Sequence, residues 1–373
     1  MKIAVNTQLL IKDKLEGIGW FIYETLKRIT IQHPEHHFTF LFDRPFPDEF
    51  IFSGNITPII VSPPSRHPAL WYLRFEHLIP HILKKHKPDL FFSPDGWSST
   101  NTIVKTHVVI HDLNFEHYPK DLSIANRLFF KHYFPKYANN AERIATVSEY
   151  SKKDIVDTYK ILPEKIDVVY NGVNENYKPI SELEKELTKQ KISQKADYFL
   201  YVGALHPRKN ISNLLKAFDE FKKTNSNDIK LVIVGEKYWW TNEIQRAYDG
   251  MKFKSEVIFL GAQQAAQLKN IIASAKAMLY VSKFEGFGIP ILEAMQCDVP
   301  VITSNVTSMP EVAGNSAILV DPFSIDSIKN AMLQITSDEY LRKDLIEKGR
   351  IRRNNFSWDK TAQLLWKSIE KSL

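Results

Sequence analysis

Short runs of apolar, β-branched residues alternate with longer amphipathic stretches along most of the chain. Several of these runs are apolar at every position, which is typical of strands covered by helices on both faces. The alternation of strand and helix patterns predicts an α/β fold with parallel, doubly wound sheets. The expected strands form two series: Lys2–Asn6, Phe38–Phe42, Pro58–Val61, Leu90–Ser93, His107–Ile110, Ile144–Val147 and Asp167–Tyr170, followed by Tyr198–Val202, Lys230–Val234, Val257–Leu260, Ala277–Val281, Pro300–Thr303 and Ala317–Val320.

The two series are separated by a region that reads as a domain boundary. Asn171 and Gly172 form a turn signal, and the charged stretch SELEKELTKQKISQK that follows predicts a surface helix or linker. A length of 373 residues also fits two domains of ordinary size. We therefore expect two Rossmann-like domains, residues 1–175 and 176–355, with an amphipathic segment at 356–373.

Composition excludes several classes of protein. The single cysteine, Cys297, rules out a disulfide framework within the chain and argues against a cysteine-based zinc site. No apolar run approaches the roughly 18 residues that span a bilayer, and the N-terminus resembles a strand more than a secretory signal. The net charge of +6 is spread out, without a basic block typical of nucleic-acid binding. We expect a cytoplasmic protein whose partners are anionic small molecules or an anionic membrane surface, not nucleic acid.

The segment EGFGIPILE, residues 285–293, follows an expected strand and begins an expected helix. Its glycines allow a ligand to approach the backbone closely, and the free N–H groups of the helix start favour a phosphate. Glu285 and Glu293 can each accept two hydrogen bonds from the vicinal hydroxyls of a sugar. A plain glycine-rich turn, with a glutamate that favours the helix start, is the competing interpretation.

A second loop follows the strand Tyr198–Val202. It begins at Gly203 and contains the adjacent cations Arg208 and Lys209. Ligands of doubly wound sheets bind at the carboxyl ends of the strands, and a pair of cations at that place suits a diphosphate. A solvated loop is the alternative.

Two weaker patterns lie in the first half. Gly17 and Gly19 form a G-x-G turn after the first strand, and His111 follows the strand His107–Ile110, where it could contact a substrate hydroxyl. The other histidines of this half show no metal-ligand spacing and are expected at the surface or in interfaces; they include His33, His36, His37, His77, His81 and His86. No Asp-x-Asp stands at a strand end, so we expect activity without a metal ion.

The segment from Ser65 to Lys87 combines aromatic and apolar residues with basic ones. A basic amphipathic helix of this kind can lie on an anionic membrane. We favour a core helix with cations at its end, because Pro80 is expected to break it.

Taken together, these segments resemble the retaining glycosyltransferases of family 4, which have the GT-B fold of two Rossmann-like domains facing a central cleft. The resemblance covers nearly the whole chain. It is specific in combination and is close to the mannosyltransferase B-like subgroup. The matching segments are EGFGIPILEAMQCDVPVITSNVTSMPEVAGNSAILVDP (285–322), VIHDL (109–113), TVSEYSKKDI (146–155), VVYNGV (168–173), FSW (356–358) and WYLRFEHLIP (71–80).

The resemblance implies a role for each matching position. Glu285 would face the donor sugar, Glu293 would hold the ribose hydroxyls, and Arg208 with Lys209 would neutralise the departing diphosphate. His111 would contact the donor sugar, and the last segment would form a helix that returns to the first domain. The remaining donor contacts would come from Gly17, Gly19, Gly203, Leu260, Gly261, Phe287, Gly288 and Ile289.

The favoured hypothesis is transfer of a hexose, with mannose from GDP-mannose preferred, to a glycan or lipid-linked acceptor of a surface polysaccharide. No cofactor or metal is expected beyond the sugar nucleotide itself. Peripheral contact with the inner face of the cytoplasmic membrane stays open. A sugar-nucleotide 2-epimerase and a non-catalytic sugar-nucleotide sensor are the alternatives, since both could use the same residues.

Overall fold

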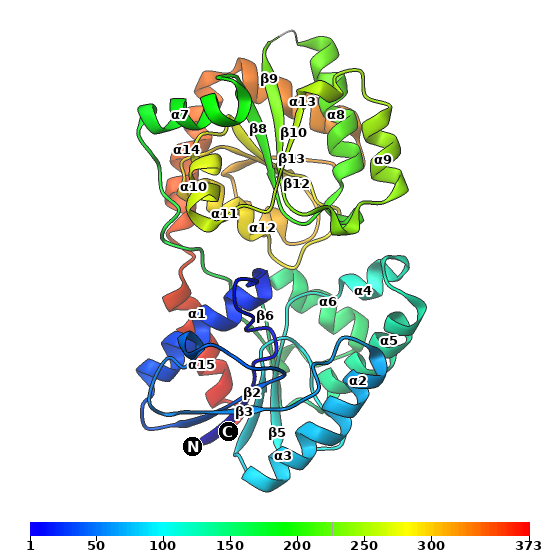
Figure 1. Cartoon of the computed structure of the whole chain (residues 1–373), viewed down its shortest axis with the longest axis vertical. Helices are drawn as coiled ribbons and strands as arrows, with labels where there is room; N and C mark the ends of the chain where they lie inside the picture. The colour runs from blue at the N-terminus through cyan, green and yellow to red at the C-terminus, as the bar shows by residue number, and fades with distance from the viewer. Residues whose placement is uncertain (226) are drawn as a thin grey trace. The chain divides into compact units, whose positions relative to one another are not determined.

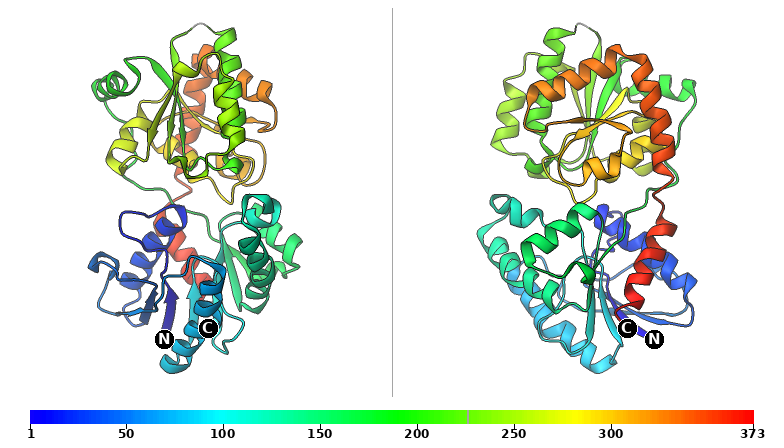
Figure 2. Two further views of the ribbon diagram at one scale, coloured as in Figure 1. Left: turned by 45° about the vertical axis from the view of Figure 1, so that its right-hand side comes forward. Right: turned by 180° about the vertical axis from the view of Figure 1, so that it is seen from behind.

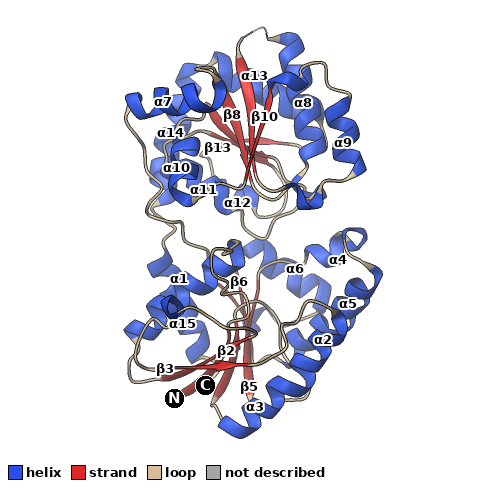
Figure 3. Ribbon diagram, viewed as in Figure 1, coloured by secondary structure: helices blue, strands red, loops and turns tan. Residues whose placement is uncertain are grey.

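The computed structural model describes residues 1–225 and 227–373 and divides the chain into two compact units. One unit comprises Met1–Gly172 together with Ser357–Leu373, and the other comprises Val173–Phe356. Each unit has a central sheet with helices on both of its faces (Figure 1, Figure 3). We call them the N-terminal unit and the C-terminal unit.

The N-terminal unit contains a seven-stranded sheet in the order β3-β2-β1-β4-β5-β6-β7, in which all pairs are parallel. Its strands are β1 (Lys2–Asn6), β2 (His37–Phe42), β3 (Ile56–Ile60), β4 (Leu90–Ser93), β5 (Lys105–Ile110), β6 (Arg143–Thr146) and β7 (Ile166–Val168). Its helices are α1 (Gly17–Gln32), α2 (Pro68–Leu73), α3 (Ile79–His86), α4 (Asn114–His117), α5 (Ile124–Asn140), α6 (Glu149–Tyr159) and α15 (Trp358–Glu370).

The C-terminal unit contains a six-stranded parallel sheet in the order β10-β9-β8-β11-β12-β13. Helices α8, α9 and α13 pack together, and α7, α10, α11 and α14 form a second group (Figure 1). The strands are β8 (Asp197–Val202), β9 (Ile229–Val234), β10 (Val257–Gly261), β11 (Ala277–Tyr280), β12 (Val301–Ser304) and β13 (Ala317–Val320). The helices are α7 (Glu182–Ser193), α8 (Ile211–Thr224), α9 (Asn242–Asp249), α10 (Ala265–Ala273), α11 (Ile289–Gln296), α12 (Met309–Ala313), α13 (Ile325–Ser337) and α14 (Glu339–Arg353).

The predicted α/β fold is confirmed, and every expected strand is present with ends shifted by no more than a few residues. The strands are recognisable because their side chains are buried on both faces, as in β8, where five consecutive residues are buried. The charged stretch after residue 180 forms helix α7. Ser181 and Glu184 start it with a capping box.

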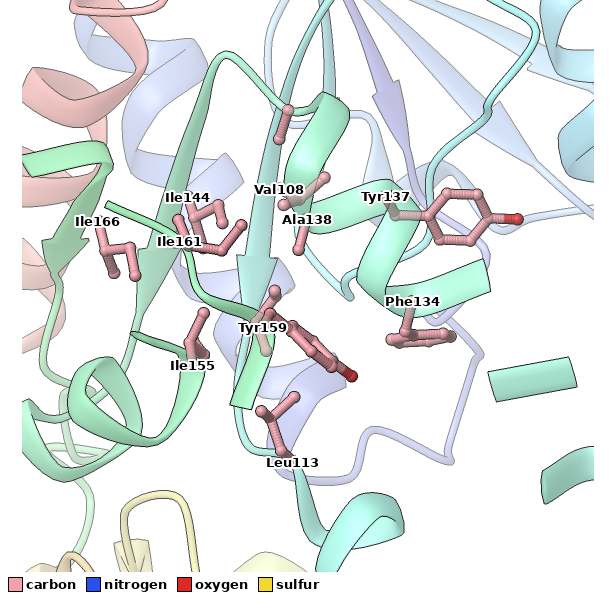
Figure 4. Packing of buried hydrophobic residues seen from close by; sticks show 12 residues of the cluster. Val108, Leu113, Phe134, Tyr137, Ala138, Ile144, Ile155, Tyr159, Ile161 and Ile166 are labelled. Carbon is pink, nitrogen blue, oxygen red and sulfur yellow. The ribbon is translucent and has the colours of Figure 1, made fainter. Parts of the chain in front are cut away.

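Apolar side chains from strands and helices pack closely in the N-terminal unit (Figure 4). Val108, Ile144 and Ile166 project from the neighbouring strands β5, β6 and β7, and each is at most 1% exposed. Ala138 of α5 and Ile155 of α6 cover them. This packing fixes the end of β5 from which His111 emerges.

The expected break at Pro80 is wrong. The chain is helical from Pro68 to His86, through α2, a wider π-helical turn at Arg74–Leu78, and α3. Proline has no N–H for the carbonyl of Glu76, and Asn101 Nδ2 donates to that carbonyl instead, at 3.0 Å. Arg74 also differs from the other cations of this helix, because it is fully buried and donates to the carbonyls of Val61 and Leu41.

Helix α15 packs against α1 within the N-terminal unit, and in Figure 2 it appears in red beside the blue helix. Arg28 Nε donates to Asp359 at 2.6 Å, and Ser368 and Lys371 both bind Asp167 at 2.7 Å. A Cβ at Gly172 would lie 2.3 Å from the Trp358 nitrogen, so the chain requires glycine at this turn.

Candidate functional site

The order of the strands places two loops side by side in the C-terminal unit. Strand β8 has β9 on one side and β11 on the other, so the direction of winding reverses between β8 and β11. Ligands of doubly wound sheets bind at this switch point, beyond the carboxyl ends of the strands. The Lys283 N–H donates to the carbonyl of Arg208 at 2.8 Å, which ties the loop after β8 to the loop after β11.

Three charged side chains meet where these loops touch. Lys209 Nζ lies 2.5 Å from Glu285 Oε1, and Arg208 Nη1 lies 3.0 Å from Glu285 Oε2. Glu285 is only 6% exposed. Lys209 also donates to the hydroxyl of Tyr280 at 2.8 Å. We call Arg208, Lys209 and Glu285 the ion triad.

The triad keeps the Glu285 carboxyl ionised. Burial by itself would raise the pKa of Glu285, but the charges of Lys209 and Arg208 outweigh that effect and lower the pKa to about 2. At neutral pH the site therefore holds one buried negative charge and two positive charges. An anionic ligand could form charge-assisted hydrogen bonds with the two cations.

The backbone before α11 is shaped for close approach. Gly288 has a φ of +101°, in the left-handed region that glycine adopts readily, and precedes the first residue of α11, Ile289. Ser308 Oγ donates to the carbonyls of Glu285 and Phe287, at 2.9 Å and 3.1 Å. Free N–H groups at the start of a helix bind anions, so this loop suits a phosphate or a polarised hydroxyl.

Glu293 lies on α11 in a different environment from Glu285. Burial raises the pKa of Glu293 to about 7, and the hydrogen bond from Tyr177 offsets only part of that rise. Glu293 is thus partly protonated near neutral pH. Hydroxyl donors from a bound ribose would favour its ionised form.

The remaining predicted donor residues of this unit lie at the ends of neighbouring strands. Gly203 follows β8 with a φ of +146°, and a Cβ at Gly235, after β9, would lie 1.9 Å from the Gly203 carbonyl oxygen. Leu260 and Gly261 end β10, and the Gly261 carbonyl accepts from the Gly235 N–H at 3.0 Å. The close backbone contact explains why glycine is needed at Gly235, a position that sequence reasoning missed.

The predicted residues of the N-terminal unit lie near its own switch point, between β1 and β4. Gly17 and Gly19 are in the first turn of α1. His111 lies past β5, with its ring 4.9 Å from that of Phe21 and its Nε2 donating to the carbonyl of Pro94 at 2.9 Å. Burial lowers the pKa of His111, so the ring is neutral and its Nδ1 is left as an acceptor.

A buried polar cluster at the same switch point was not predicted. Asp95 accepts from Asn6 and Gln8, both at 2.8 Å, and from Ser93 at 2.9 Å. Burial raises the pKa of Asp95, although these three hydrogen bonds oppose the rise. The position of Asp95 just after β4, at a carboxyl strand end, is the sequence feature that could have identified this cluster.

Sequence reasoning also missed the side chains that support the two glutamates. Tyr280 is the last residue of β11, and its place at a carboxyl strand end is the pattern that could have identified it. Ser308 precedes α12, and Tyr177 lies in the segment that leads into the C-terminal unit. Nothing in the sequence near these two residues distinguishes them, because their contacts are tertiary.

The architecture defines the class of protein. Two doubly wound, parallel-sheet units with this order of strands are the GT-B arrangement. Solved structures agree: Anabaena Alr3699/HepE, determined in complex with UDP and glucose, superposes with a TM-score of 0.77 at 16% identity over 99% of each chain. WaaG, a glycosyltransferase involved in lipopolysaccharide biosynthesis, superposes with a TM-score of 0.73 at 17% identity over 97% of each chain.

Family models identify both halves of the chain. Residues 15–177 match Glycosyltransferase Family 4, and residues 183–352 match Glycosyl transferases group 1. The chain therefore belongs to these glycosyltransferases and is a transferase.

Curated relatives are similar over the full length or over part of it. The O-antigen chain mannosyltransferase B of Escherichia coli is 27% identical over 377 residues, which cover 96% of this chain and 97% of that protein. The O-antigen chain mannosyltransferase RfbU of Salmonella typhimurium is 32% identical over 228 residues, 61% of this chain and 60% of that protein.

In the part of the chain that the structure describes, no helix is both long enough and apolar enough to span a bilayer.

Proposed function

We propose that the protein is a retaining hexosyltransferase that moves mannose from GDP-mannose to a glycan or lipid-linked acceptor during surface polysaccharide synthesis. The observation that supports this proposal best is the ion triad at the switch point of the C-terminal sheet, beside the start of α11. Mannose is favoured because the two curated relatives described above are mannosyltransferases. Retention of the anomeric configuration is implied by the family resemblance.

The charges of the triad fit the chemistry of this reaction. Breaking the bond between the anomeric carbon and the diphosphate leaves positive charge on the sugar and negative charge on the departing diphosphate. In the proposal, Arg208 and Lys209 turn from Glu285 toward the diphosphate and stabilise its charge. The Glu285 carboxylate, which the two cations keep ionised before they turn, then accepts hydrogen bonds from the sugar hydroxyls, and these bonds favour its charged form.

The other predicted residues complete the proposed donor contacts. Glu293 holds the ribose hydroxyls, and the N–H groups at Phe287–Ile289 bind sugar and phosphate oxygens. Gly203, Leu260 and Gly261 line the nucleotide at the strand ends, and Gly17, Gly19 and His111 of the N-terminal unit contact phosphate and sugar. The two cations perform the charge stabilisation that a divalent metal performs elsewhere. We therefore expect turnover to persist in excess EDTA.

The first experiment identifies the donor. Thermal shift with GDP-mannose, UDP-glucose and ADP-glucose ranks the nucleotides, because a bound ligand raises the melting temperature by mass action. GDP-mannose is expected to give the largest shift and to support mannose transfer to a lipid-linked saccharide. A larger shift with another nucleotide sugar would overturn the choice of mannose but not of transfer.

The second experiment tests transfer against the two alternatives. The protein is incubated with donor alone, and the nucleotide sugars are separated by chromatography. An epimeric nucleotide sugar would identify an epimerase, and binding without any transfer or hydrolysis would identify a sensor. Slow release of GDP, accelerated by an acceptor, is the expected result.

We also propose that the N-terminal unit contacts an anionic membrane, where a lipid-linked acceptor would lie. Helices α2 and α5 pack together and expose apolar side chains beside cations. Pro68, Leu128 and Phe129 line a hollow of about 600 Å³ there together with the cation Lys131. The exposed apolar residues of these two helices are Tyr72 and Leu73 in α2 and Ile124 and Leu128 in α5.

Vesicle sedimentation tests the membrane proposal. Binding to vesicles with anionic lipid should fall with added salt and should weaken in the charge-reversal variant Lys131→Glu. Lys254→Glu, which changes the same charge in the C-terminal unit, is the matched control. Equal binding to neutral and anionic vesicles, or none to either, would contradict this proposal and leave the proposed transfer unaffected.

A further inference from the structure

Three potential metal ligands meet at a turn of the N-terminal unit, away from the strand ends discussed above. Helix α1 ends at Gln32 and β2 begins at His37, so the turn between them lies at the amino ends of the parallel strands. His33, Glu35 and His36 all lie in this turn. In the part of the chain that the structure describes, they form the one group of three or more such side chains with ligand atoms within 4.8 Å of one another.

The distances within this group are close to those of a coordination shell. His33 Nδ1 lies 3.6 Å from Glu35 Oε1, and His36 Nε2 lies 3.2 Å from the same oxygen. Ligands about 2.0–2.1 Å from a tetrahedral zinc ion lie roughly 3.3 Å from one another. The side chains would need only small adjustments to bind one ion together.

The two imidazole rings are held by a neighbouring helix. Their planes differ by 14°, and both rings stack on Trp366 of α15, with centroid separations of 4.0 Å for His33 and 5.1 Å for His36. The Met1 amine lies 3.3 Å from His36 Nδ1, so Nε2 is the ring nitrogen that faces Glu35. Fixed rings lose little conformational freedom when they bind a ligand.

A hollow next to the group leaves room for an ion and its water. It measures about 540 Å³ and includes Glu35, His36 and Asn55 in its lining. His33 and His36 are part-buried, whereas the Glu35 side chain is 59% exposed. Three protein ligands with one side open to solvent match a site in which water fills the fourth position.

We propose that His33, Glu35 and His36 bind a divalent transition metal of the zinc class through His33 Nδ1, a Glu35 carboxylate oxygen and His36 Nε2. Imidazole nitrogens with a carboxylate are ligands that zinc accepts well. The competing explanation is a simple hydrogen-bonded cluster, in which Glu35 accepts from both rings without an ion. The site is separate from the proposed transfer reaction, because it lies at the opposite ends of the strands from Gly19 and His111.

The metal would stabilise the N-terminal unit. Its ligands rest on Trp366, so an ion there would hold the turn before β2 against α15. Binding to the folded chain alone raises the melting temperature, and the rise grows with the logarithm of the metal concentration relative to the dissociation constant. The site therefore has a readout that does not depend on the transferase activity.

Titration with Zn²⁺ against a chromogenic chelator tests the proposal. The protein should have no polyhistidine tag and should keep Met1 as its first residue, since that amine contacts His36. One Zn²⁺ per chain at micromolar affinity is expected, and His33→Ala and His36→Ala should each weaken it by at least about tenfold, since each removes one ligand. Zn²⁺ should raise the melting temperature of the unmodified chain and not that of His33→Ala/His36→Ala.

His117→Ala is the matched control. His117 also pairs with a carboxylate, Asp154, at 2.8 Å, but among the described residues it does not belong to a group of three possible metal ligands. Its loss should leave the stoichiometry and affinity for Zn²⁺ unchanged. No binding below about 100 μM, or equal binding by the unmodified chain and by the folded double variant, would overturn the proposal and support the hydrogen-bonded cluster.

Discussion

Each of the two sheets has a buried acidic side chain at the same topological position, but the pKa of the two side chains is shifted in opposite directions. Asp95 follows β4 and Glu285 follows β11, and each of these strands lies beside the first strand of its own sheet, across the switch point. Asp95 accepts hydrogen bonds from amides and a hydroxyl, whereas Glu285 pairs with two cations. Burial raises the pKa of Asp95 and its hydrogen bonds offset only part of that rise, whereas the two cations lower the pKa of Glu285 to about 2.

The contrast shows that burial alone does not decide the charge of these sites. Both carboxyl groups are almost fully buried, and burial raises the pKa of each. Neutral donors offset only part of that effect in the N-terminal unit. Full positive charges reverse it in the C-terminal unit, where the proposed reaction develops negative charge on a leaving group.

The largest expected effect comes from dismantling the ion triad. Glu285→Gln and Lys209→Ala should each reduce transfer at least ~100-fold, because each removes a charged contact to the transition state. Initial rates with saturating donor and acceptor measure the loss, and circular dichroism checks the fold. Arg208 still pairs with Glu285 when Lys209 is removed, so the Lys209 variant should remain folded.

Lys283→Ala is the control for this prediction. Lys283 lies in the same loop, and its backbone N–H joins the two loops, but neither ion pair of the triad involves its side chain. Its loss should change the rate less than about threefold. Near-normal turnover in either triad variant would show that the charges of the ion triad are not needed for transfer, and the contrast between Glu285 and Asp95 would then have no bearing on catalysis.

Glu293 sharpens the comparison, because it is an acid of the C-terminal unit without the cations of the triad. The pKa of Glu293 is raised to about 7 in the folded chain, from about 4.5 in the unfolded chain. The stability that its protonated form contributes is therefore full below pH 4.5 and is lost as the pH rises through 7. Glu285 has the opposite sign: its contribution is present above about 4.5 and is lost as the pH falls toward 2.

Calorimetry at pH 5 and pH 8 tests these signs. Glu293→Gln should gain about 2 kcal/mol of stability relative to the unmodified chain between the two pH values, since the variant cannot ionise. Glu285→Gln should show no such gain. Parallel pH profiles for the unmodified chain and Glu293→Gln would show that Glu293 ionises at its ordinary pH and that burial is not decisive there.

The fold was predictable because each strand is a compact apolar run, while the partners of the site residues were not. Lys209 and Glu285 are 76 residues apart in sequence and meet only because β8 and β11 are neighbours. The sequence predicted both residues at carboxyl strand ends, but it predicted a diphosphate as the partner of Lys209 and a sugar as the partner of Glu285. At Pro80 the sequence predicted a break that does not occur, because a side-chain amide distant in sequence, that of Asn101, donates to the carbonyl that the proline leaves without a donor.

A smaller effect is expected from adding a Cβ to a glycine in each unit, which tests whether the backbone at that position requires glycine. Gly288 has a φ of +101°, and a Cβ there would lie 3.1 Å from Ile291 Cδ1. A Cβ at Gly17 would have no atom within 4 Å among the described residues, apart from its chain neighbours and its own helix backbone. Gly288→Ala should cost about 1–2 kcal/mol of stability, seen as a melting temperature lower by a few degrees, and Gly17→Ala less than about 0.5 kcal/mol. Equal melting temperatures would mean that the loop before α11 adapts without strain.

A small effect is also expected at Asp95, where charge is not required. Asp95→Asn keeps one acceptor for Asn6 and Ser93 but turns an amide toward the donor of Gln8, which should cost about 1 kcal/mol. The pKa of Asp95 is raised above its ordinary value of 3.8, so the unmodified chain loses stability as the pH rises past that value and the variant does not. The cost should therefore be larger at pH 3.5 than at pH 8. Calorimetry of the two chains at both pH values measures it. A cost that grows with pH would mean that Asp95 is stabilised as an anion, and the two switch points would then hold charge alike.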